Sequence, residues 1–539
     1  MSFTAAERTA LTPYFTTLDG PVFALVNLPE TVKGALFARY SRSAKPLRRL
    51  FLDEFAGDLA DRPAAAAGDV GAARAERLYA RVFNDYGDDS VAQLGGVHLA
   101  VEDASNILTK VLERGRLMAY LEQSTRYIPY TERRGDRWRY LVPAELDDHP
   151  ALRRRYIETM DAAFERYAAW IDPMRAWFEA RYPKSPADSD GVYRAAIRAK
   201  ALDTLRGMLP AATQSNVGIY GTGQAYESLL LRMRAHPLAE VQATAAAMLE
   251  ELRKVIPAFL TRADQPERGG AWSAYLAETR DRTARISAVH GPRSTVHGAG
   301  PDGPAVLADD EVTLTDFDPE GEVKVVAAAL YATGSRSDAE LAALARGMSP
   351  GEREDVLRAY VGDRTNRRHK PGRAFERTGY RFDILTDYGA FRDLQRHRLL
   401  TIDWQALTPR HGYTQPEAIV DAGGDADWRE VMDRSAALHE ALCDAGLAEA
   451  APYAVSMAYR VRFVMDMNAR EAMHVIELRT APQGHPAYRR VCQQMHKLID
   501  ERAGHHAIAR TMRFVDHSEV ELERLQAERA LERKRLSPS

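Results

Sequence analysis

The sequence is poor in cysteine and has no long apolar run, and each shortage excludes a class of protein. Only Cys443 and Cys492 occur among 539 residues, too few for a disulfide framework, and no Cys/His cluster has zinc-ligand spacing. No apolar run is long enough to span a bilayer, and the opening MSFTAAERTALTPYF lacks the regions of a secretory signal. We therefore expect a cytoplasmic protein that uses neither a membrane nor a metal site.

The chain also lacks an excess of either charge. Its 73 basic and 76 acidic residues leave a formal net charge of −3, so no overall basic field attracts nucleic acid. Nucleic-acid binding through local arginines remains a disfavoured alternative, which steep salt dependence of oligonucleotide binding would support. With 45% apolar and 28% charged residues, the composition is that of a folded globular protein, and its length predicts two or three domains.

Apolar residues recur mainly at helical spacing. The segments predicted to be helical are 28–56, 76–130, 149–183 (a helix pair), 238–260, 336–360, 383–395, 427–447, 453–478 and 487–502. Short strands are predicted at 310–318 and at the start of 322–333, where a helix start is the alternative. Glycine and proline are dense in 262–310, which predicts a boundary. The predicted domains are 1–262 (the first copy), a linker at 263–310, 311–516 (the second copy) and a charged tail at 517–539.

The names first and second copy reflect two short repeats. RGRLMAYLEQ at 114–123 and RHRLLTIDWQ at 396–405 keep Arg, Arg, Leu and Gln in register. LLLRMRAHPLAEVQ at 229–242 is similar to IELRTAPQGHPAYRRV at 476–491, which aligns Arg232 with Arg479. A diverged tandem duplication explains both pairs, although matches this short also arise by chance.

The motif RHRLL suits an anionic ligand. The guanidinium groups of Arg396 and Arg398 flank His397 and offer many donors, which match phosphate, pyrophosphate or the edge of a polar heterocycle. The preceding FDILTDYGAFRDLQ is amphipathic, so these arginines are predicted near a helix end. The alternative is a solvated basic helix terminus, which the helix dipole favours without any ligand.

The stretch LEQSTRYIPY predicts a phosphate-binding loop. If it is extended, Glu122, Ser124 and Arg126 share one face, and a hydroxyl beside a guanidinium group can hold a phosphate. Glu122 can then accept from a heterocycle or position an arginine. The alternative is a loop with an intramolecular pair between Glu122 and Arg126.

These motifs, in this order and spacing, resemble those of the flavin-dependent thymidylate synthases. Further segments resemble that family: ARYSRS at 38–43, LRGMLP at 205–210 and MNAREAMHVIELR at 467–479, besides RHR and EQSTRY at 122–127. The resemblance covers most of both copies. It implies a helix-rich α/β (α+β) protein with two tandem domains, each a small sheet packed by long helices.

The departures from the family pattern are complementary. The second copy has Trp404, Ala406 and Thr408 where the family has its nucleotide-binding Glu, Ser and Arg, and it has Pro452 at the position of Arg206. The first copy has Gly115 for the motif histidine and GTG at 221–223 for the family's NAR. Each copy thus retains what the other has lost. Simple decay of both copies is the alternative, although random decay would as readily strike the same position twice.

The resemblance implies one composite site, because the family assembles its active site between subunits of a homotetramer. By resemblance, the cofactor-binding residues are Arg396, His397, Arg398, Asn468, Arg470 and His474. The implied substrate-binding residues are Gln123, Ser124, Arg126, Arg206 and Arg479, and Arg479 and Glu122 are the implied catalytic residues. A homodimer of such chains would mimic the tetramer.

The implied reaction is the reductive methylation of dUMP to dTMP, with methylenetetrahydrofolate as the carbon donor, FAD as the cofactor and NADPH as the reductant. The alternative is a flavin- or nucleotide-binding protein of the same fold that has lost dTMP synthesis or methylates another pyrimidine. Trp404, at a position where the family has glutamate, motivates that alternative.

Overall fold

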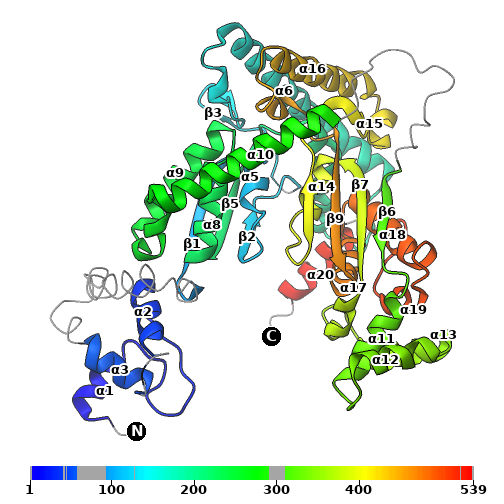
Figure 1. Ribbon diagram of the computed structural model, residues 1–539. Coiled ribbons are helices and arrows are strands. Elements are labelled where there is room, and N and C mark those ends of the chain that lie inside the picture. The colour runs from blue at the N-terminus through cyan, green and yellow to red at the C-terminus, as the bar shows by residue number, and fades with distance from the viewer. Residues whose placement is uncertain are drawn as a thin grey trace. The chain divides into compact units, whose positions relative to one another are not determined.

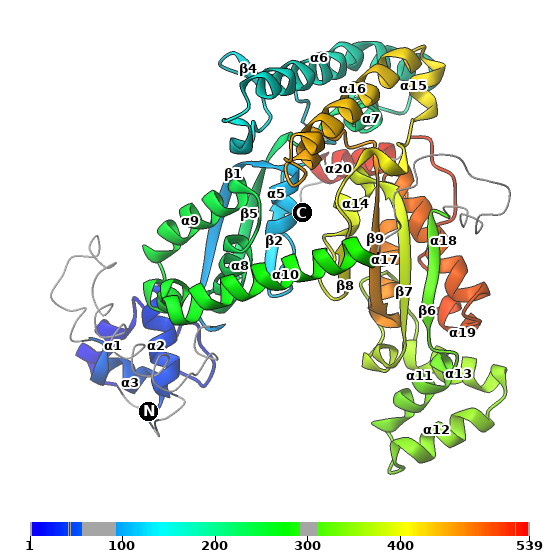
Figure 2. The same cartoon turned by 45° about the horizontal axis from the view of Figure 1, so that its top comes forward.

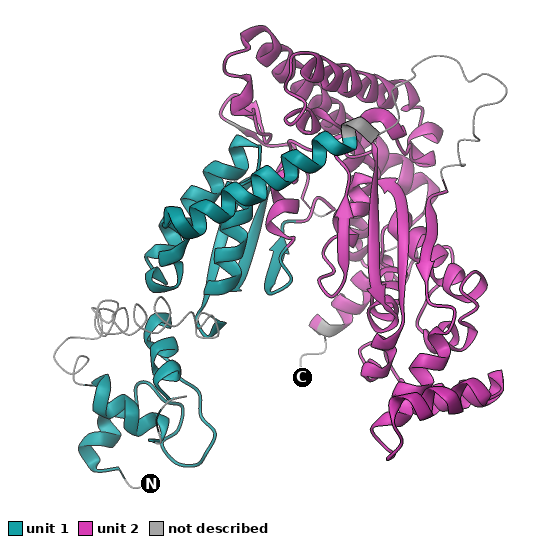
Figure 3. Ribbon diagram, in the orientation of Figure 1, with its two compact units in different colours: residues 1–104, 115–123, 215–297 teal, residues 105–114, 124–214, 298–539 magenta. Residues whose placement is uncertain are grey.

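The computed structural model describes residues 3–40, 43, 45–56, 93–126, 128–290, 310–522 and 524–536. The chain forms two compact units (Figure 3): unit 1 comprises Met1–Ala104, Gly115–Gln123 and Ser215–His297, and unit 2 comprises Ser105–Arg114, Ser124–Gln214 and Gly298–Ser539. Unit 2 therefore contains much of the first copy as well as the second. Within the described ranges, no helix combines the length and apolarity that crossing a membrane requires.

Unit 1 has a three-stranded sheet in the order β1-β5-β2. Its strands are β1 (Gly96–Ser105), β2 (Met118–Glu122) and β5 (Gln214–Thr222), and its helices are α1 (Ala5–Leu11), α2 (Glu30–Tyr40), α3 (Leu47–Glu54), α8 (Gly223–Arg234), α9 (Ala239–Arg253) and α10 (Ala271–His290). β2 and β5 are antiparallel, with Met118 opposite Gly221 and Glu122 opposite Val217. The Thr222 side chain accepts a hydrogen bond from the Ala225 amide, which caps α8 directly after β5.

Unit 2 has a four-stranded sheet in the order β6-β7-β9-β8 and a two-stranded ribbon of β3 and β4. The strands are β3 (Arg133–Arg134), β4 (Arg137–Trp138), β6 (Val312–Phe317), β7 (Gly379–Asp387), β8 (Thr401–Trp404) and β9 (Arg460–Asn468). The helices are α5 (Asn106–Leu112), α6 (Pro150–Arg181), α7 (Asp190–Leu205), α11 (Gly321–Tyr331), α12 (Asp338–Gly347), α13 (Pro350–Val361), α14 (Tyr388–Leu394), α15 (Glu417–Asp421), α16 (Asp425–Asp444), α17 (Ala469–Arg479), α18 (Pro486–Glu501), α19 (His506–Thr511) and α20 (Leu525–Leu536).

The four-stranded sheet is antiparallel throughout, and buried side chains hold helices against it. β7 and β9 pair along their full lengths, from Gly379 opposite Asn468 to Asp387 opposite Arg460. The apolar side chains of Phe382 and Ile384 are fully buried, and α17 and α18 pack on the strands (Figure 1). Elsewhere in unit 2, α6, α7, α15 and α16 gather into one helical layer (Figure 2). The helix-rich α+β class and the two small antiparallel sheets confirm the expected fold.

The predicted duplication is visible in the order of elements. Strand, helix and strand occur as β1-α5-β2 and as β7-α14-β8, and strand, helix and helix occur as β5-α8-α9 and as β9-α17-α18. The capping residues of α5 and α14, Ser105 and Asp387, lie 282 positions apart. Those of α8 and α17, Thr222 and Asn468, lie 246 positions apart. The caps thus pair Asn468 with Thr222, one position away from the predicted alignment of GTG with NAR.

The two copies meet in a short backbone ladder within unit 2. Pro210 and Ser456, which are also 246 positions apart, form an antiparallel bridge. On either side, the Ala211 amide donates to the Val455 carbonyl (2.8 Å) and the Met457 amide donates to the Leu209 carbonyl (2.9 Å). Each of these two bonds is the counterpart of the other, so the ladder has local two-fold symmetry.

Several predicted helices are partly strands. Residues 96–105, inside the predicted helix 76–130, form β1, and 453–478 comprises a short turn, β9 and α17. Part of 383–395 likewise belongs to β7. These strands carry short apolar runs, and periodicity alone cannot distinguish such a run from a buried helix.

Other helix predictions need smaller corrections. The predicted helix pair at 149–183 is the single helix α6, with Pro173 in its interior. Residues 321–331 form α11, which confirms the helix start given as the alternative to a strand, and α10 occupies part of the predicted linker. β6 confirms the strand predicted at 310–318, and α20 lies in the predicted charged tail. Ser41 and Arg42 of the ARYSRS segment, Tyr127, residues 76–92 of the predicted helix 76–130 and residues 291–309 of the predicted linker lie outside the described residues.

Candidate functional site

The RHR motif follows directly on a helix, as predicted. α14 ends at Leu394 with Gln395 as its capping residue, so Arg396, His397 and Arg398 come immediately afterwards. The His397 side chain is buried, whereas Arg398 is exposed. The motif therefore directs its imidazole into unit 2.

The predicted extended face of Glu122, Ser124 and Arg126 does not form. β2 ends at Glu122, and the chain enters a turn at Thr125 and Arg126, where the Arg126 amide donates to Ser124 Oγ (3.3 Å). Glu122 and Gln123 belong to unit 1, where the Gln123 amide donates to the Asn216 carbonyl (2.9 Å). The other predicted site residues belong to unit 2.

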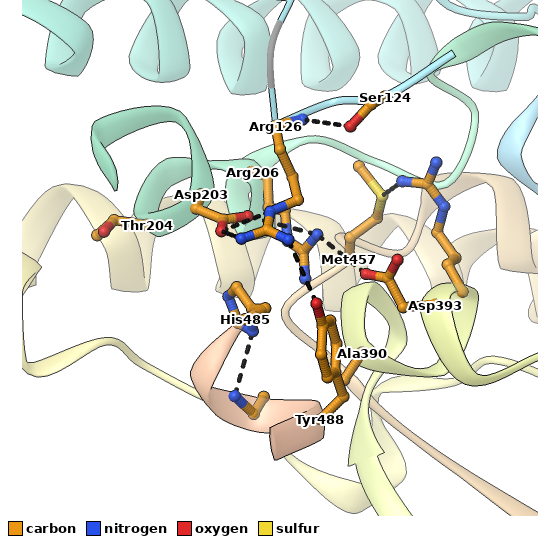
Figure 4. A network of polar contacts seen from close by, with 12 residues as sticks. Ser124, Arg126, Asp203, Thr204, Arg206, Ala390, Asp393, Met457, His485 and Tyr488 are labelled. Carbon is orange, nitrogen blue, oxygen red and sulfur yellow. Dashed lines mark hydrogen bonds and ion pairs between the residues drawn. The ribbon is translucent and has the colours of Figure 1, made fainter. Parts of the chain in front are cut away.

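Two arginines of the first copy share one carboxylate in unit 2 (Figure 4). Arg126 Nε donates to Asp203 Oδ2 (2.7 Å), and Arg206 Nη1 lies 3.5 Å from Asp203 Oδ1. Arg126 Nη1 also donates to Tyr488 Oη (3.3 Å), which belongs to α18 of the second copy. The predicted phosphate-binding arginines are therefore together and touch the second copy.

A second carboxylate joins the two copies. Asp393 lies 3.7 Å from Arg206, 3.8 Å from Arg396 and 3.8 Å from Arg479, measured between nitrogen and oxygen. Burial opposes the ionisation of Asp393, but these three guanidinium groups outweigh it and lower the pKa of the carboxyl group. We call Arg126, Arg206, Arg396, Arg479, Asp203 and Asp393 the arginine cluster.

The arginine cluster has more positive than negative charge. Burial opposes the ionisation of Asp203 as well, but the neighbouring His485, Arg126 and Arg206 outweigh burial and lower the pKa of this carboxyl group. Burial, with a contribution from Arg206, lowers the pKa of the adjacent His485 to about 3, so this imidazole is neutral. Within the arginine cluster, four guanidinium groups therefore face two carboxylates, a surplus of two positive charges. This count leaves out Asp387, which lines the same cavity beside Arg206 and whose pKa is raised by burial. A dianionic phosphate would balance that surplus.

Arg206 retains an unused donor in this cluster. Its side chain is only 6% exposed, yet Nη2 has no hydrogen-bond partner among the described residues. A Cβ atom at Gly389 would lie 3.1 Å from this nitrogen, so glycine lets α14 approach the guanidinium group. Arg206, Asp203 and His485 line a cavity of about 830 Å³. A buried donor without a partner beside a cavity is a ligand-binding feature.

The RHR histidine contacts α17. His397 Nε2 accepts a hydrogen bond from Arg479 Nε (2.9 Å), its Nδ1 lies 3.7 Å from Glu471 Oε1, and its ring centroid lies 5.6 Å from that of His474. Asn468 caps α17, because its Oδ1 accepts from the Glu471 amide (2.9 Å). The structure thus brings His397 to the helix that carries Asn468, Arg470, His474 and Arg479.

The set of His397, Glu471 and His474 has ligand atoms within 4.8 Å of one another, as a metal site would need. Its surroundings, however, are positively charged: Lys370 and Arg479 depress the pKa values of both histidines, after burial as the main cause. Arg367 adds to this effect at His474. Positive neighbours repel a cation and attract an anion, so these surroundings suit an anionic group better than a metal ion.

The counterpart of the RHR motif in the first copy has different neighbours. Arg114 pairs with Asp403 (2.6 Å) and its Cζ lies over the Trp404 ring, 5.2 Å from the centroid. Trp404 also packs against Phe391 (5.4 Å between centroids). Side chains of this protein therefore contact one another where the resemblance implies a lost nucleotide loop.

Five residues of the site were not predicted from the sequence: Asp203, Asp393, Glu471, His485 and Tyr488. A signal existed for the first two, because DTLR at 203–206 and DLQR at 393–396 place Asp and Arg three residues apart, one helical turn. His485 begins a His-Pro step that both copies carry, at 236–237 and 485–486, but the sequence alone gives this step no role.

Comparison with known proteins identifies the family. The family described as "Thymidylate synthase complementing protein" matches residues 38–258 and 313–503, and the chain belongs to it. A "UPF0159 protein" of Chlamydia muridarum is 37% identical over 98% of both chains, and one of Thermoplasma acidophilum is 29% identical over 92% of this chain and 97% of its own. A "Flavin-dependent thymidylate synthase" of Mycobacterium marinum is 30% identical over 33% of this chain and 66% of its own.

Proposed function

We propose that unit 2 binds a pyrimidine nucleoside monophosphate beside a flavin, and that the chain catalyses the reductive methylation of dUMP to dTMP. The observation that carries this proposal is the arginine cluster, with its surplus of two positive charges and the unused donor of Arg206. A nucleoside monophosphate near neutral pH presents a dianionic phosphate that fits this charge.

The nucleotide-binding residues have separate tasks. Arg126 and Arg206 bind the phosphate, with the Ser124 hydroxyl as a further donor. Arg479 reaches the pyrimidine edge, where a guanidinium group stabilises negative charge that develops on a carbonyl oxygen. The roles of Glu122 and Gln123 depend on the family resemblance alone, since both belong to unit 1.

Six residues would hold the flavin: Arg396, His397, Arg398, Asn468, Arg470 and His474. Bound FAD, reduced by NADPH, supplies the electrons that turn the carbon from methylenetetrahydrofolate into a methyl group. Arg470 is already oriented by the Pro371 carbonyl (2.9 Å) and by Glu376 (3.3 Å). Asn468 uses its side-chain oxygen to cap α17, which leaves its amide NH₂ group for the cofactor.

A second candidate is a protein that binds flavin and nucleotide but makes no dTMP, or methylates another pyrimidine. Two observations favour it. Trp404 stands beside Arg114 at a position where the family has glutamate, and the two relatives from Chlamydia muridarum and Thermoplasma acidophilum, which match over 92% or more of the chain, are named UPF0159 proteins. The similarity to named thymidylate synthases covers a third of the chain.

One experiment separates these candidates. The purified protein is incubated with FAD, NADPH, methylenetetrahydrofolate and dUMP tritiated at carbon 5, and tritium release, dTMP and bound flavin are measured. Tritium release coupled to dTMP formation supports the synthase. Stoichiometric flavin and bound dUMP without release support the second candidate, and absence of both ligands contradicts the whole proposal.

We further propose a homodimer that forms a pseudo-tetramer, as in the implied family arrangement. Sedimentation equilibrium tests this proposal directly. A mass near 120 kDa, roughly twice the 60.1 kDa of the chain, is expected, and a monomer that nevertheless binds flavin and nucleotide would contradict it.

A further inference from the structure

A buried chain of polar contacts leads from α17 to the arginine cluster. It runs from Glu471 to His397 (3.7 Å from Oε1 to Nδ1) and from His397 to Arg479 (2.9 Å from Nε2 to Nε). The side chains of His397 and Glu471 are 5% and 6% exposed. Arg479 in turn lies 3.8 Å from Asp393, so the chain ends at the proposed nucleotide site.

The direction of these contacts determines the tautomer of His397. Arg479 Nε carries a hydrogen and can only donate, so His397 Nε2 must be the acceptor. Burial and the charge of Arg479 hold the pKa of His397 well below its ordinary value, and the neutral ring has a single N–H. That proton is therefore on Nδ1, which faces Glu471.

Glu471 differs from the other buried glutamate of its helix. Glu477 forms a complete ion pair with Arg364 (2.5 Å). The Glu471 carboxyl group, by contrast, has no hydrogen-bond or ion-pair partner other than His397 in the described part of the chain. Burial raises its pKa to about 7, and the positive charges of Lys370 and Arg470 oppose this effect only partly.

The groups around this carboxyl group come from three places. Arg470 and His474 lie on its own helix, Lys370 belongs to the segment before β7, and His397 follows α14. None of these groups forms a close ion pair with the Glu471 carboxylate. The carboxyl group can therefore gain and lose its proton near neutral pH.

We propose that Glu471 is a positioning residue that acts through His397 to hold Arg479 against the bound nucleotide. When Glu471 is ionised, its negative charge, 3.7 Å from Nδ1, attracts the Nδ1 hydrogen of His397, which makes Nε2 a better acceptor for Arg479. Protonation of Glu471 weakens the hydrogen bond from Arg479 Nε to His397 Nε2. This inference rests on the proposed nucleotide site and adds pH control to it.

The arrangement belongs to the second copy alone. The position 246 residues before Glu471 is Ala225, and the position 282 residues before His397 is Gly115. Neither can form such a contact, so the first copy offers no substitute if Glu471 is removed.

The test measures dUMP affinity from pH 5.5 to 8.5 by calorimetry for the wild type, Glu471→Gln, His397→Gln and the double variant. Because the dUMP phosphate also titrates, only differences between variants count. We expect the wild type to lose roughly fivefold more affinity than Glu471→Gln as the pH falls from 8 to 6. The double variant should behave like His397→Gln, because Glu471 acts only through His397.

The control is Asp466→Asn, which removes an exposed carboxylate on β9 next to α17. Its pH profile should match the wild type. If Glu471→Gln also matches the wild type while dUMP binds, the positioning role is wrong. Additive effects in the double variant would overturn it as well, as would a stoichiometric divalent metal ion that is lost in Glu471→Gln.

A second readout needs no ligand. In protein with ¹⁵N-labelled histidine, the His397 signals should report the Nδ1–H tautomer and shift with a midpoint near pH 7, a transition that Glu471→Gln abolishes. If this transition occurs but dUMP does not bind, the proposed function fails and the Glu471–His397 coupling stands. Absence of the transition contradicts the inference itself.

Discussion

Arg396 and Arg114 hold matching positions in the two copies, directly after α14 and α5, and their neighbours differ. Arg396 lies 3.8 Å from Asp393, which it shares with Arg206 and Arg479. Arg114 is paired with Asp403 (2.6 Å) and lies over Trp404. Arg396 therefore shares its carboxylate with two further arginines, whereas Arg114 has a carboxylate and an aromatic ring as its neighbours.

Differences at counterpart positions explain this contrast. Where the second copy has Asp393, the first has Val111, 282 positions earlier, and where the first copy has Arg206, the second has Pro452, 246 positions later. Neither proline nor valine can bind an anion or orient an arginine. These differences support our proposal that the two copies have diverged into one composite ligand site and one site filled by side chains.

The substitution Arg206→Leu should have the largest effect on dUMP binding among the tests of this contrast. Loss of the buried guanidinium group should weaken dUMP binding by about 4 kcal/mol, roughly a thousandfold, because a buried charge then lacks its partner. Arg114→Leu is the matched control, and calorimetry should find its dUMP affinity within about twofold of the wild type. Equal losses of dUMP affinity in Arg206→Leu and Arg114→Leu would show that the surroundings of the two arginines do not differ in nucleotide binding.

Arg398→Ala and Ser124→Ala sharpen the division between flavin and nucleotide. We expect Arg398→Ala to lose flavin, by roughly a hundredfold in affinity, and Ser124→Ala to keep flavin while dUMP binds about tenfold more weakly. Flavin absorbance after gel filtration and dUMP calorimetry provide the measurements. Equal loss of flavin in both variants would argue against separate sites.

Glu471→Gln tests a carboxyl group that the first copy lacks. A pKa raised from 4.5 to about 7 destabilises the folded protein above pH 7, and this penalty disappears as the pH falls below 4.5. The variant should therefore unfold at higher denaturant than the wild type at pH 8, by about 2 kcal/mol, with a smaller difference at pH 5.5. A constant difference at both pH values would show that Glu471 does not titrate in this range.

Trp404→Glu tests the contacts of Arg114 in the first copy. It removes the contact between Arg114 and the indole ring, which is worth about 1 kcal/mol, and restores the residue type of the family. We expect a small loss of stability in chemical unfolding and no second equivalent of bound dUMP, because Pro452 still replaces the buried arginine. Two equivalents per chain would mean that Trp404 alone blocks that position.

The fold class and the duplication could be predicted because they depend on local patterns. The RHR motif follows a helix because FDILTDYGAFRDLQ contains the end of β7 and all of α14. The boundaries of β1 and β9 could not be predicted in this way, because a buried strand and a buried helix segment present the same apolar run. Pairing across the sheet, which involves residues far apart in sequence, decides between them.

The site was predictable where a motif carries it and not where tertiary contacts create it. Arg126, Arg206 and His397 stand in recognisable motifs. Asp393 and Asp203 stand one helical turn before their arginines, yet only the fold brings the two pairs together. The elevated pKa of Glu471 depends on burial, which no spacing in the sequence reveals.

The backbone ladder between Leu209–Ala211 and Val455–Met457 bears on how such a protein can evolve. A chain that builds this ladder by self-association must accept every substitution at both ends at once. A chain that contains both ends can change them one at a time. Pro452 can therefore replace the arginine in the second copy while the first copy keeps Arg206. Because the ladder is made of main-chain atoms, it tolerates such asymmetry in the side chains, and each copy is free to specialise.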